Sequence, residues 1–205
     1  PYRRQRQMCI RDRCQAVSAL ADAEHGDAVI VTDVGQNQMF GARYSRFNST
    51  RSFITSGGLG TMGFGLPAAI GAKLGMPGRE VVAILGDGGF QMTIQELGTI
   101  KQEQLGLKIV VLNNSYLGMV RQWQQLFHDR RYSFTPMDNP DFTMIASAYG
   151  IPADRVSDPA ELPGAMRKLA DAPGPYFLEV VVRPEENVFP MVPAGESLSN
   201  VMCKE

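Results

Sequence analysis

The chain has 205 residues, of which 44% are hydrophobic, and it carries a formal net charge of −1 at pH 7. This length and composition are typical of a globular protein with one well-packed α/β domain. The near-neutral charge gives no electrostatic basis for binding nucleic acid, and no apolar run approaches the roughly 20 residues that span a membrane. The three cysteines, Cys9, Cys14 and Cys203, follow no metal-ligand spacing. So small a number of cysteines suits a protein of the reducing cytoplasm.

Residues 1–13 differ from the rest of the chain. They read PYRRQRQMCIRDR, which is rich in arginine and lacks apolar periodicity. A basic tail or a targeting arm would have this composition. We interpret the segment as non-native or disordered sequence joined to a truncated domain, and we assign it no function. The domain itself is expected to cover residues 14–205.

Apolar runs and helical spacings alternate along this domain. Buried strands are expected at 28–32, 53–55, 81–85, 109–112 and 176–182. Helices are expected at 16–24, 66–74, 93–104, 116–127, 141–149 and 159–170. This alternation predicts a doubly wound, mainly parallel sheet with helices on both faces and a ligand at its carboxyl edge.

The most informative stretch joins two of these strands. VVAIL runs into the turn Gly86-Asp87-Gly88-Gly89, and IVVL runs into Asn113-Asn114. Because a right-handed crossover connects the two strands, both turns should lie on the same edge of the sheet. The carboxylate of Asp87 and the amide oxygen of Asn114 are hard ligands that suit Mg²⁺, which takes its remaining ligands from water or phosphate. The stretch therefore predicts a diphosphate bridged by a metal ion.

A GDG turn followed about thirty residues later by NN resembles the signature of the thiamine-diphosphate enzymes. GGLGTMGFGLPAAIGA at 57–72, GQNQM at 35–39 and VFPMVPAGESLSNVM at 188–202 are similar to the acetolactate (acetohydroxyacid) synthase branch of that family. The resemblance covers residues 14–205 and implies the thiamine-diphosphate-binding fold. A Rossmann-like turn with an incidental asparagine pair is the alternative reading.

The resemblance implies a set of cofactor contacts. The family has a histidine where this chain has Asn37, and that amide can still donate a hydrogen bond. Met62 would hold the cofactor in a bent shape, although a methionine is commonly a core residue. A plain helix cap is the alternative reading of the turn at Gln36. The full set of expected cofactor contacts is Gln36, Asn37, Gly60, Met62, Gly86, Gly88 and Gly89.

The resemblance also implies the metal shell and a substrate channel. The metal ligands would be Asp87, Asn114 and the backbone oxygen of Tyr116. Met119, Val120 and Trp123 match positions that line the channel, although a lone tryptophan on a helix is more often a core or interface residue. The same helix is expected to pack Leu117, Val120 and Leu126 inward. The C-terminal stretch is expected to cross the site as a lid.

The implied activity is decarboxylation of pyruvate and its carboligation to a second 2-keto acid such as 2-ketobutyrate. This reaction belongs to valine, leucine and isoleucine biosynthesis. The family's glutamate lies in a separate N-terminal domain and FAD in a middle domain, so no catalytic side chain is expected in this chain. The isolated chain should bind the cofactor weakly and not turn over. A homo-oligomer with a small regulatory subunit is expected for the full-length protein.

Two alternative functions stay open at this point. One is a different enzyme of the same cofactor class, such as glyoxylate carboligase, pyruvate oxidase or a 2-keto acid decarboxylase. The other is a non-catalytic diphosphate-binding module.

Overall fold

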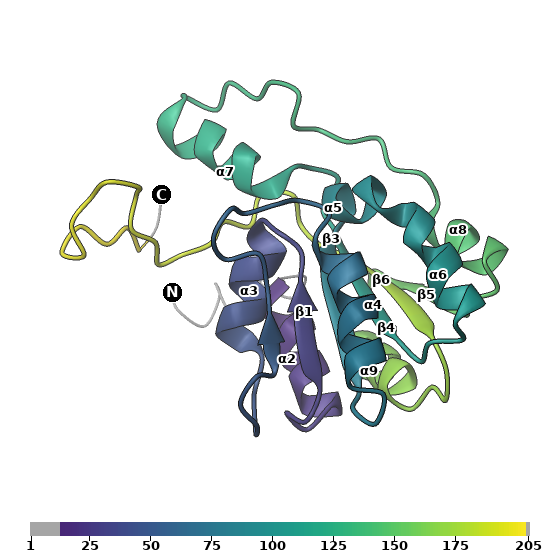
Figure 1. Ribbon diagram of the computed structural model, residues 1–205. Coiled ribbons are helices and arrows are strands. Elements are labelled where there is room, and N and C mark those ends of the chain that lie inside the picture. Colours follow the sequence, from purple (N-terminus) through teal and green to yellow (C-terminus); the bar gives the residue numbers. More distant parts are fainter. Residues whose placement is uncertain (1–12, 204–205) are drawn as a thin grey trace.

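A computed structural model describes residues 13–203 and shows one six-stranded sheet flanked by helices (Figure 1). All neighbouring strands are parallel, and their order across the sheet is β2-β1-β3-β4-β6-β5. The strands are β1 (Val29–Thr32), β2 (Phe53–Ile54), β3 (Val81–Gly86), β4 (Lys108–Asn113), β5 (Ala153–Val156) and β6 (Tyr176–Val181). The predicted fold class is therefore confirmed.

Helices cover both faces of the sheet. They are α2 (Arg13–Ala23), α3 (Gln36–Tyr44), α4 (Gly65–Gly75), α5 (Asp87–Met92), α6 (Leu97–Gln102), α7 (Gly118–Phe127), α8 (Phe142–Ala148) and α9 (Leu162–Ala170), with a 3₁₀ turn η1 at Ile94–Glu96. Among residues 13–203, none of these helices is long and apolar enough to cross a membrane.

The central strands supply side chains to two separate cores. Ala83 and Leu85 of β3 pack on one face with α4, α5, α6 and α8, whereas Val82 and Ile84 pack on the other with α2, α3 and α9. Side chains alternate between the faces of a strand, so a strand buried on both sides must be apolar at every position. This requirement explains the unbroken apolar run that identified β3 in the sequence.

Three elements differ from the sequence predictions. Helix α3 was not predicted, because its first residues were interpreted as a turn after β1. The helix predicted over 93–104 begins one residue later and is formed by η1 and α6, while the predicted glycine turn before it continues into the short helix α5. Thr93 leaves the helical conformation (φ −134°, ψ 27°) and separates α5 from η1. Its hydroxyl donates to the Gly63 carbonyl oxygen (3.3 Å), which ties the break to the glycine-rich loop. Strand β5 was not predicted, because a short edge strand containing Asp154 and Arg155 carries no apolar run.

The strand order changes direction between β1 and β3. The chain leaves β1 toward β2 on one side and returns through β3 toward β4 on the other. Loops after β1 and β3 therefore separate at this point and leave a crevice at the carboxyl edge, where open α/β sheets bind their ligands. Gly86 of β3 pairs with Leu112 of β4, so the turns that follow these two strands begin at the same level.

Candidate functional site

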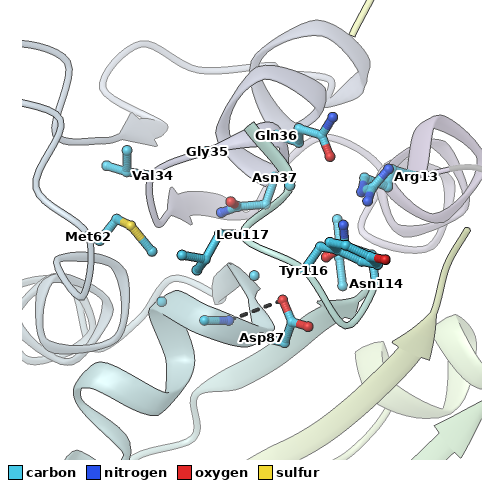
Figure 2. A pocket seen from close by; sticks show the side chains of 15 residues that line it. Arg13, Val34, Gly35, Gln36, Asn37, Met62, Asp87, Asn114, Tyr116 and Leu117 are labelled. Carbon is cyan, nitrogen blue, oxygen red and sulfur yellow. Dashed lines mark hydrogen bonds between the residues drawn. The ribbon is translucent and has the colours of Figure 1, made fainter. Parts of the chain in front are cut away.

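A small polar cavity of about 40 Å³ occupies this crevice. Figure 2 shows side chains converging on it from the ends of β1, β3 and β4. A volume of this size holds an ion or a few water molecules. The cavity lining contains most of the predicted diphosphate and metal residues: Gln36, Asn37, Met62, Gly86, Asp87, Gly88, Gly89, Asn114 and Tyr116.

Asp87 is the buried carboxylate at this cavity. Its Oδ1 accepts from the Gly88 backbone N–H (3.1 Å), and its Oδ2 accepts from the Asn139 amide (2.8 Å). Burial raises the pKa of the Asp87 carboxyl above its usual range, and these two hydrogen bonds counteract the rise in part. A buried anion with few protein donors is a place where a cation would be stabilised.

Asn114 and Tyr116 reach the same cavity from the end of β4. One end of the Asn114 amide lies 2.9 Å from the Tyr116 carbonyl oxygen, and the other lies 2.7 Å from a guanidinium nitrogen of Arg13. Hydrogen bonding alone places the amide nitrogen toward Tyr116 and the oxygen toward Arg13. Ser115 between them has a positive φ of 55°, which turns the chain sharply after the strand.

Gln36 and Asn37 open helix α3 and face the cavity from the β1 side (Figure 2). The Gln36 Nε2 donates to Gln122 (2.9 Å) and to the Glu186 carbonyl oxygen (3.0 Å), while its buried Oε1 has no hydrogen-bond partner. Asn37 donates to the Ile84 carbonyl oxygen (3.0 Å) of β3. An unpaired buried oxygen is costly by about 1–3 kcal/mol, so Gln36 is a position where a ligand would add stability.

Glycine is required where the turn after β3 meets its neighbours. A Cβ on Gly88 would lie 2.7 Å from the Leu117 side chain, and one on Gly89 would lie 2.2 Å from Asp33 Oδ1. No side chain fits in these spaces without displacing its neighbour. The glycines of the GDGG turn therefore serve close packing as well as access to the cavity.

Asp33 is a structurally important residue to which the sequence analysis assigned no role. It directly follows β1, is 1% exposed, and its two oxygens accept from the backbone N–H groups of Gly63 (3.2 Å) and Gly65 (2.8 Å). These bonds hold the loop that carries Met62 against the crevice. The sequence signal was present, since a charged residue directly follows an apolar strand.

Met62 lines both the polar cavity and a larger apolar one of about 960 Å³. Both cavities are lined by Val34, Gly35, Met62, Leu117 and Gly118, so they are contiguous. The apolar cavity also contains the residues predicted for the cofactor ring and the channel: Gly60, Met119, Val120 and Trp123. Together the two cavities suit a ligand with an anionic end and an extended apolar body.

The predicted inward packing of Val120 is wrong. Helix α7 buries a polar face made of Arg121, Gln122 and Gln125, while Val120 is 41% exposed. The polar face is buried because it bonds to the segment after β6: Gln122 exchanges hydrogen bonds with the backbone of Val188. The apolar side chains of α7 are thereby turned toward the large cavity.

The C-terminal segment forms one wall of the apolar cavity, which it reaches with Pro190, Met191, Val192, Ala194 and Val201. In Figure 1 the segment then extends away from the sheet beyond α3 and α7. A backbone bridge between Met191 and Met202 closes it into a loop. The segment therefore borders the cavity from the side instead of crossing the polar site.

Arg13 is a further residue at the site that the sequence analysis did not select. We had grouped it with the N-terminal segment, whose other residues, 1–12, lie outside the described part of the chain. Arg13 begins α2, is buried, and contacts the Glu186 carboxylate (3.3 Å). Burial lowers the pKa of its guanidinium, and the negative charges of Glu186 and Asp87 counteract that effect.

The donor set limits what the polar cavity can bind. Within residues 13–203 no three His, Cys, Asp or Glu side chains gather as a metal site. A cation beside Asp87 would thus need amide and carbonyl oxygens and ligands from outside the protein. Hard oxygen donors with an incomplete shell suit Mg²⁺ and a phosphate ligand, so the residues present fit the predicted group.

Comparisons with known proteins agree with this geometry. Residues 33–180 match the family model described as thiamine pyrophosphate enzyme, C-terminal TPP binding domain. The chain is 51% identical over 186 residues to the acetolactate synthase isozyme 2 large subunit of Escherichia coli (strain K12), covering 90% of this chain and 34% of that protein.

Two other relatives give the same result. The acetolactate synthase large subunit of Lactococcus lactis subsp. lactis (strain IL1403) is 46% identical over 182 residues, covering 88% of this chain and 32% of that protein. Acetolactate synthase 1, chloroplastic, of Nicotiana tabacum is 46% identical over 197 residues, covering 92% of this chain and 30% of that protein. The chain thus spans about a third of the length of these relatives.

Proposed function

Because the chain belongs to the thiamine pyrophosphate enzymes through their C-terminal TPP binding domain, we propose that its carboxyl-edge crevice holds the diphosphate of thiamine diphosphate through Mg²⁺. The cofactor would supply the electron sink for decarboxylation, and the protein would supply position and charge. The observation that carries the proposal is the meeting of Asp87, Asn114 and the Tyr116 carbonyl at one polar cavity.

The separation of two of these groups matches both the hydrogen bond between them and a shared cation. Adjacent ligands that lie 2.0–2.1 Å from an octahedral Mg²⁺ are about 2.9 Å apart. The Asn114 amide and the Tyr116 carbonyl oxygen are 2.9 Å apart. With a cation present, the Asn114 amide would turn its oxygen toward Tyr116, so that both oxygens and the Asp87 carboxylate face the ion.

The diphosphate would lie among Gln36, Asn37, Gly86, Gly88 and Gly89, which line the same cavity. To donate to a phosphate oxygen, the Gln36 Nε2 would have to leave its present acceptors, Gln122 Oε1 and the Glu186 carbonyl oxygen. The rest of the cofactor would pass Met62 and Gly60 into the apolar cavity. Met119, Val120 and Trp123 would then contact the substrates.

We further propose that the full-length protein is an acetolactate synthase that joins pyruvate to a second 2-keto acid in branched-chain amino acid biosynthesis. The named relatives support this activity. A cytoplasmic homo-oligomer with a small regulatory subunit and FAD bound outside this domain is the form we propose for it. Product analysis of the full-length protein with pyruvate alone and with added 2-ketobutyrate distinguishes it from other enzymes of the cofactor class.

The cofactor proposal is tested by calorimetry on this chain with thiamine diphosphate, ADP or NAD, each with and without Mg²⁺. We expect weak binding of thiamine diphosphate that requires Mg²⁺ and disappears in Asp87→Asn. Asp22→Asn is the matched control, since Asp22 is exposed and paired with Arg46 far from the cavity. Equal binding of ADP or NAD, or binding that Mg²⁺ does not affect, would contradict the proposal.

A further inference from the structure

A chain of hydrogen bonds runs from the edge strand β5 to Asp87, across three neighbouring strands of the sheet. The Arg155 Nε donates to Glu179 Oε2 (2.7 Å), and the Asn113 amide donates to Glu179 Oε1 (2.6 Å). Asn139 donates to Asn113 Oδ1 (2.9 Å) and also to Asp87 Oδ2 (2.8 Å). Every link is a side-chain contact within ordinary hydrogen-bond distance.

Glu179 is an unusual residue in this position. It lies in the middle of β6, in the apolar sequence YFLEVV, and is only 1% exposed. A buried carboxylate is strongly unfavourable unless each oxygen has a partner. Both oxygens of Glu179 have one, and the hydrogen bond from Arg155 also raises the pKa of the Arg155 guanidinium.

The ionised carboxylate sets the direction of all the bonds that follow. A carboxylate only accepts, so Asn113 must present its NH₂ group to Glu179 and its oxygen to Asn139. Asn139 must then present its NH₂ group, whose second hydrogen reaches Asp87. The Asn139 oxygen is left to accept from Gln91 (2.8 Å), and the Asn113 oxygen also accepts from the Ser115 backbone N–H (3.0 Å).

The loop that carries Asn139 is fixed at a second point. Asp141, two residues later, lies 3.6 Å from the same Arg155 that bonds to Glu179. It also caps α8 by accepting from the Met144 backbone N–H (3.0 Å). Arg155 therefore contacts both Glu179, at the far end of the chain of bonds, and the side chain of Asp141, two residues after Asn139.

From this arrangement we propose that Glu179 is a positioning residue for the metal ligand Asp87, acting through Asn113 and Asn139. The bond from Asn139 occupies Oδ2 of Asp87 and fixes the carboxylate plane, so that the remaining lone pairs face the cavity. The inference rests on the proposed function in that it treats Asp87 as a cation ligand. The dependence of the Asp87 geometry on Glu179 can be measured without any cation.

Glu179→Gln is the decisive variant. Arg155 and Asn113 bond to different oxygens of Glu179, so the single oxygen of glutamine can occupy only one of the two positions, and the charged donor forms the stronger bond. The glutamine NH₂ group then faces Asn113, which must turn over, and Asn139 must turn over in response. Asn139 would present its oxygen to the Asp87 carboxylate, and the bond that fixes Asp87 would become a repulsion.

The first readout is nuclear magnetic resonance of the cation-free chain. We expect Glu179→Gln to shift the ¹³C signal of the Asp87 carboxyl and the amide signal of Gly88, which donates to that carboxyl. The second readout is Mn²⁺ binding with thiamine diphosphate, followed by electron paramagnetic resonance. Loss of a group that orients a metal ligand typically weakens metal binding by 10- to 100-fold, and we expect about tenfold weaker binding here.

Two further variants separate positioning from a general loss of stability. In Arg155→Met/Glu179→Gln the competing donor is gone, so the glutamine oxygen is free to accept from Asn113. We expect this double variant to regain both signals and to bind Mn²⁺ within about threefold of the wild type. Asp154→Asn is the matched control, because Asp154 is the neighbour of Arg155 on β5. This substitution removes the negative charge that bonds to Lys168 and Tyr176 and leaves the Glu179 contacts in place.

The outcomes are distinguishable. Unchanged Asp87 and Gly88 signals in Glu179→Gln, or equal changes in Asp154→Asn, would overturn the positioning role. Failure of Arg155→Met to rescue Glu179→Gln would overturn it as well. If the wild-type chain does not bind Mn²⁺ with thiamine diphosphate, the proposed function fails, whereas the resonance shifts still decide the role of Glu179.

Discussion

Asp33 offers the sharpest test of how the fold holds the site together. Its carboxylate is 1% exposed and accepts from the backbone N–H groups of Gly63 and Gly65. Asp33→Asn keeps the size of the side chain but replaces one acceptor oxygen with a donor. One of the two backbone N–H groups then loses its acceptor and faces an NH₂ group instead.

The expected cost follows from these contacts. A hydrogen bond to a charged group contributes about 1.5–3 kcal/mol, and a buried donor left without a partner costs about 1–3 kcal/mol. Because these two figures partly describe the same loss, we expect the free energy of unfolding to fall by about 3 kcal/mol. In urea, with a slope of about 2 kcal/mol per molar, the unfolding midpoint would fall by about 1.5 M.

A second variant checks that the carboxylate itself is responsible. Gly89→Ala places a methyl group 2.2 Å from Asp33 Oδ1, so it should be severely destabilising in the wild type. In an Asp33→Ala background the carboxylate is gone, and the same change should cost less than about 1 kcal/mol. Urea unfolding followed by circular dichroism measures the wild type and all four variants. The reasoning is refuted if Asp33→Asn lowers the free energy of unfolding by less than about 1 kcal/mol. It is also refuted if Gly89→Ala costs the same in both backgrounds.

Three other predictions concern charge and the apolar cavity. Arg13→Ala should strengthen Mg²⁺ binding about tenfold by calorimetry, because it removes a cation near Asp87 and frees the Asn114 amide; weaker binding would contradict this. Burial and the nearby Glu80 raise the pKa of Glu24 from 4.5 to about 7, so ionisation of Glu24 in the folded protein is unfavourable. Stability should therefore fall as pH rises from 4.5 to about 7, and Glu24→Gln should remove that fall in thermal melts; an unchanged pH profile would count against it. Trp123→Leu should change unfolding stability by less than about 0.5 kcal/mol, since the side chain is 49% exposed, while altering the preference for 2-ketobutyrate over pyruvate in the full-length protein.

The central part of the fold was predictable because each central strand is buried on both faces. Continuous apolar runs identified β3 and β4, and their order along the chain determined that Asp87 and Asn114 share an edge. The edge strand β5 was not predictable in this way, because an exposed strand carries no such run. Apolar patterning therefore identified the strands that position the turns of the proposed metal site and missed the strand that carries Arg155.

Part of the site was not predictable because it depends on contacts distant in sequence. Asn139 bonds to a residue 52 positions earlier in the chain, and its surroundings in sequence read as an ordinary polar loop. Glu179 did leave a signal, namely a lone charge inside a buried strand. Such a charge requires partners, but only the strand order β4-β6-β5 shows that these are Asn113 and Arg155.

Helix α7 shows why burial of apolar residues alone was an insufficient guide. Its buried face makes polar contacts with residues that are distant in the sequence. Arg121 donates to Asn187 (2.6 Å), and Gln122 bonds to both Gln36 and Val188. Leaving these buried groups unpaired would cost more than exposing a few apolar side chains, so hydrogen bonding determines how the helix is rotated. The same rotation directs Met119 and Trp123 toward the cavity that Met62 also lines, where we propose that the cofactor and the substrates lie. A helix that had packed by hydrophobicity would have placed its glutamines there and left the apolar part of a ligand without a complementary surface.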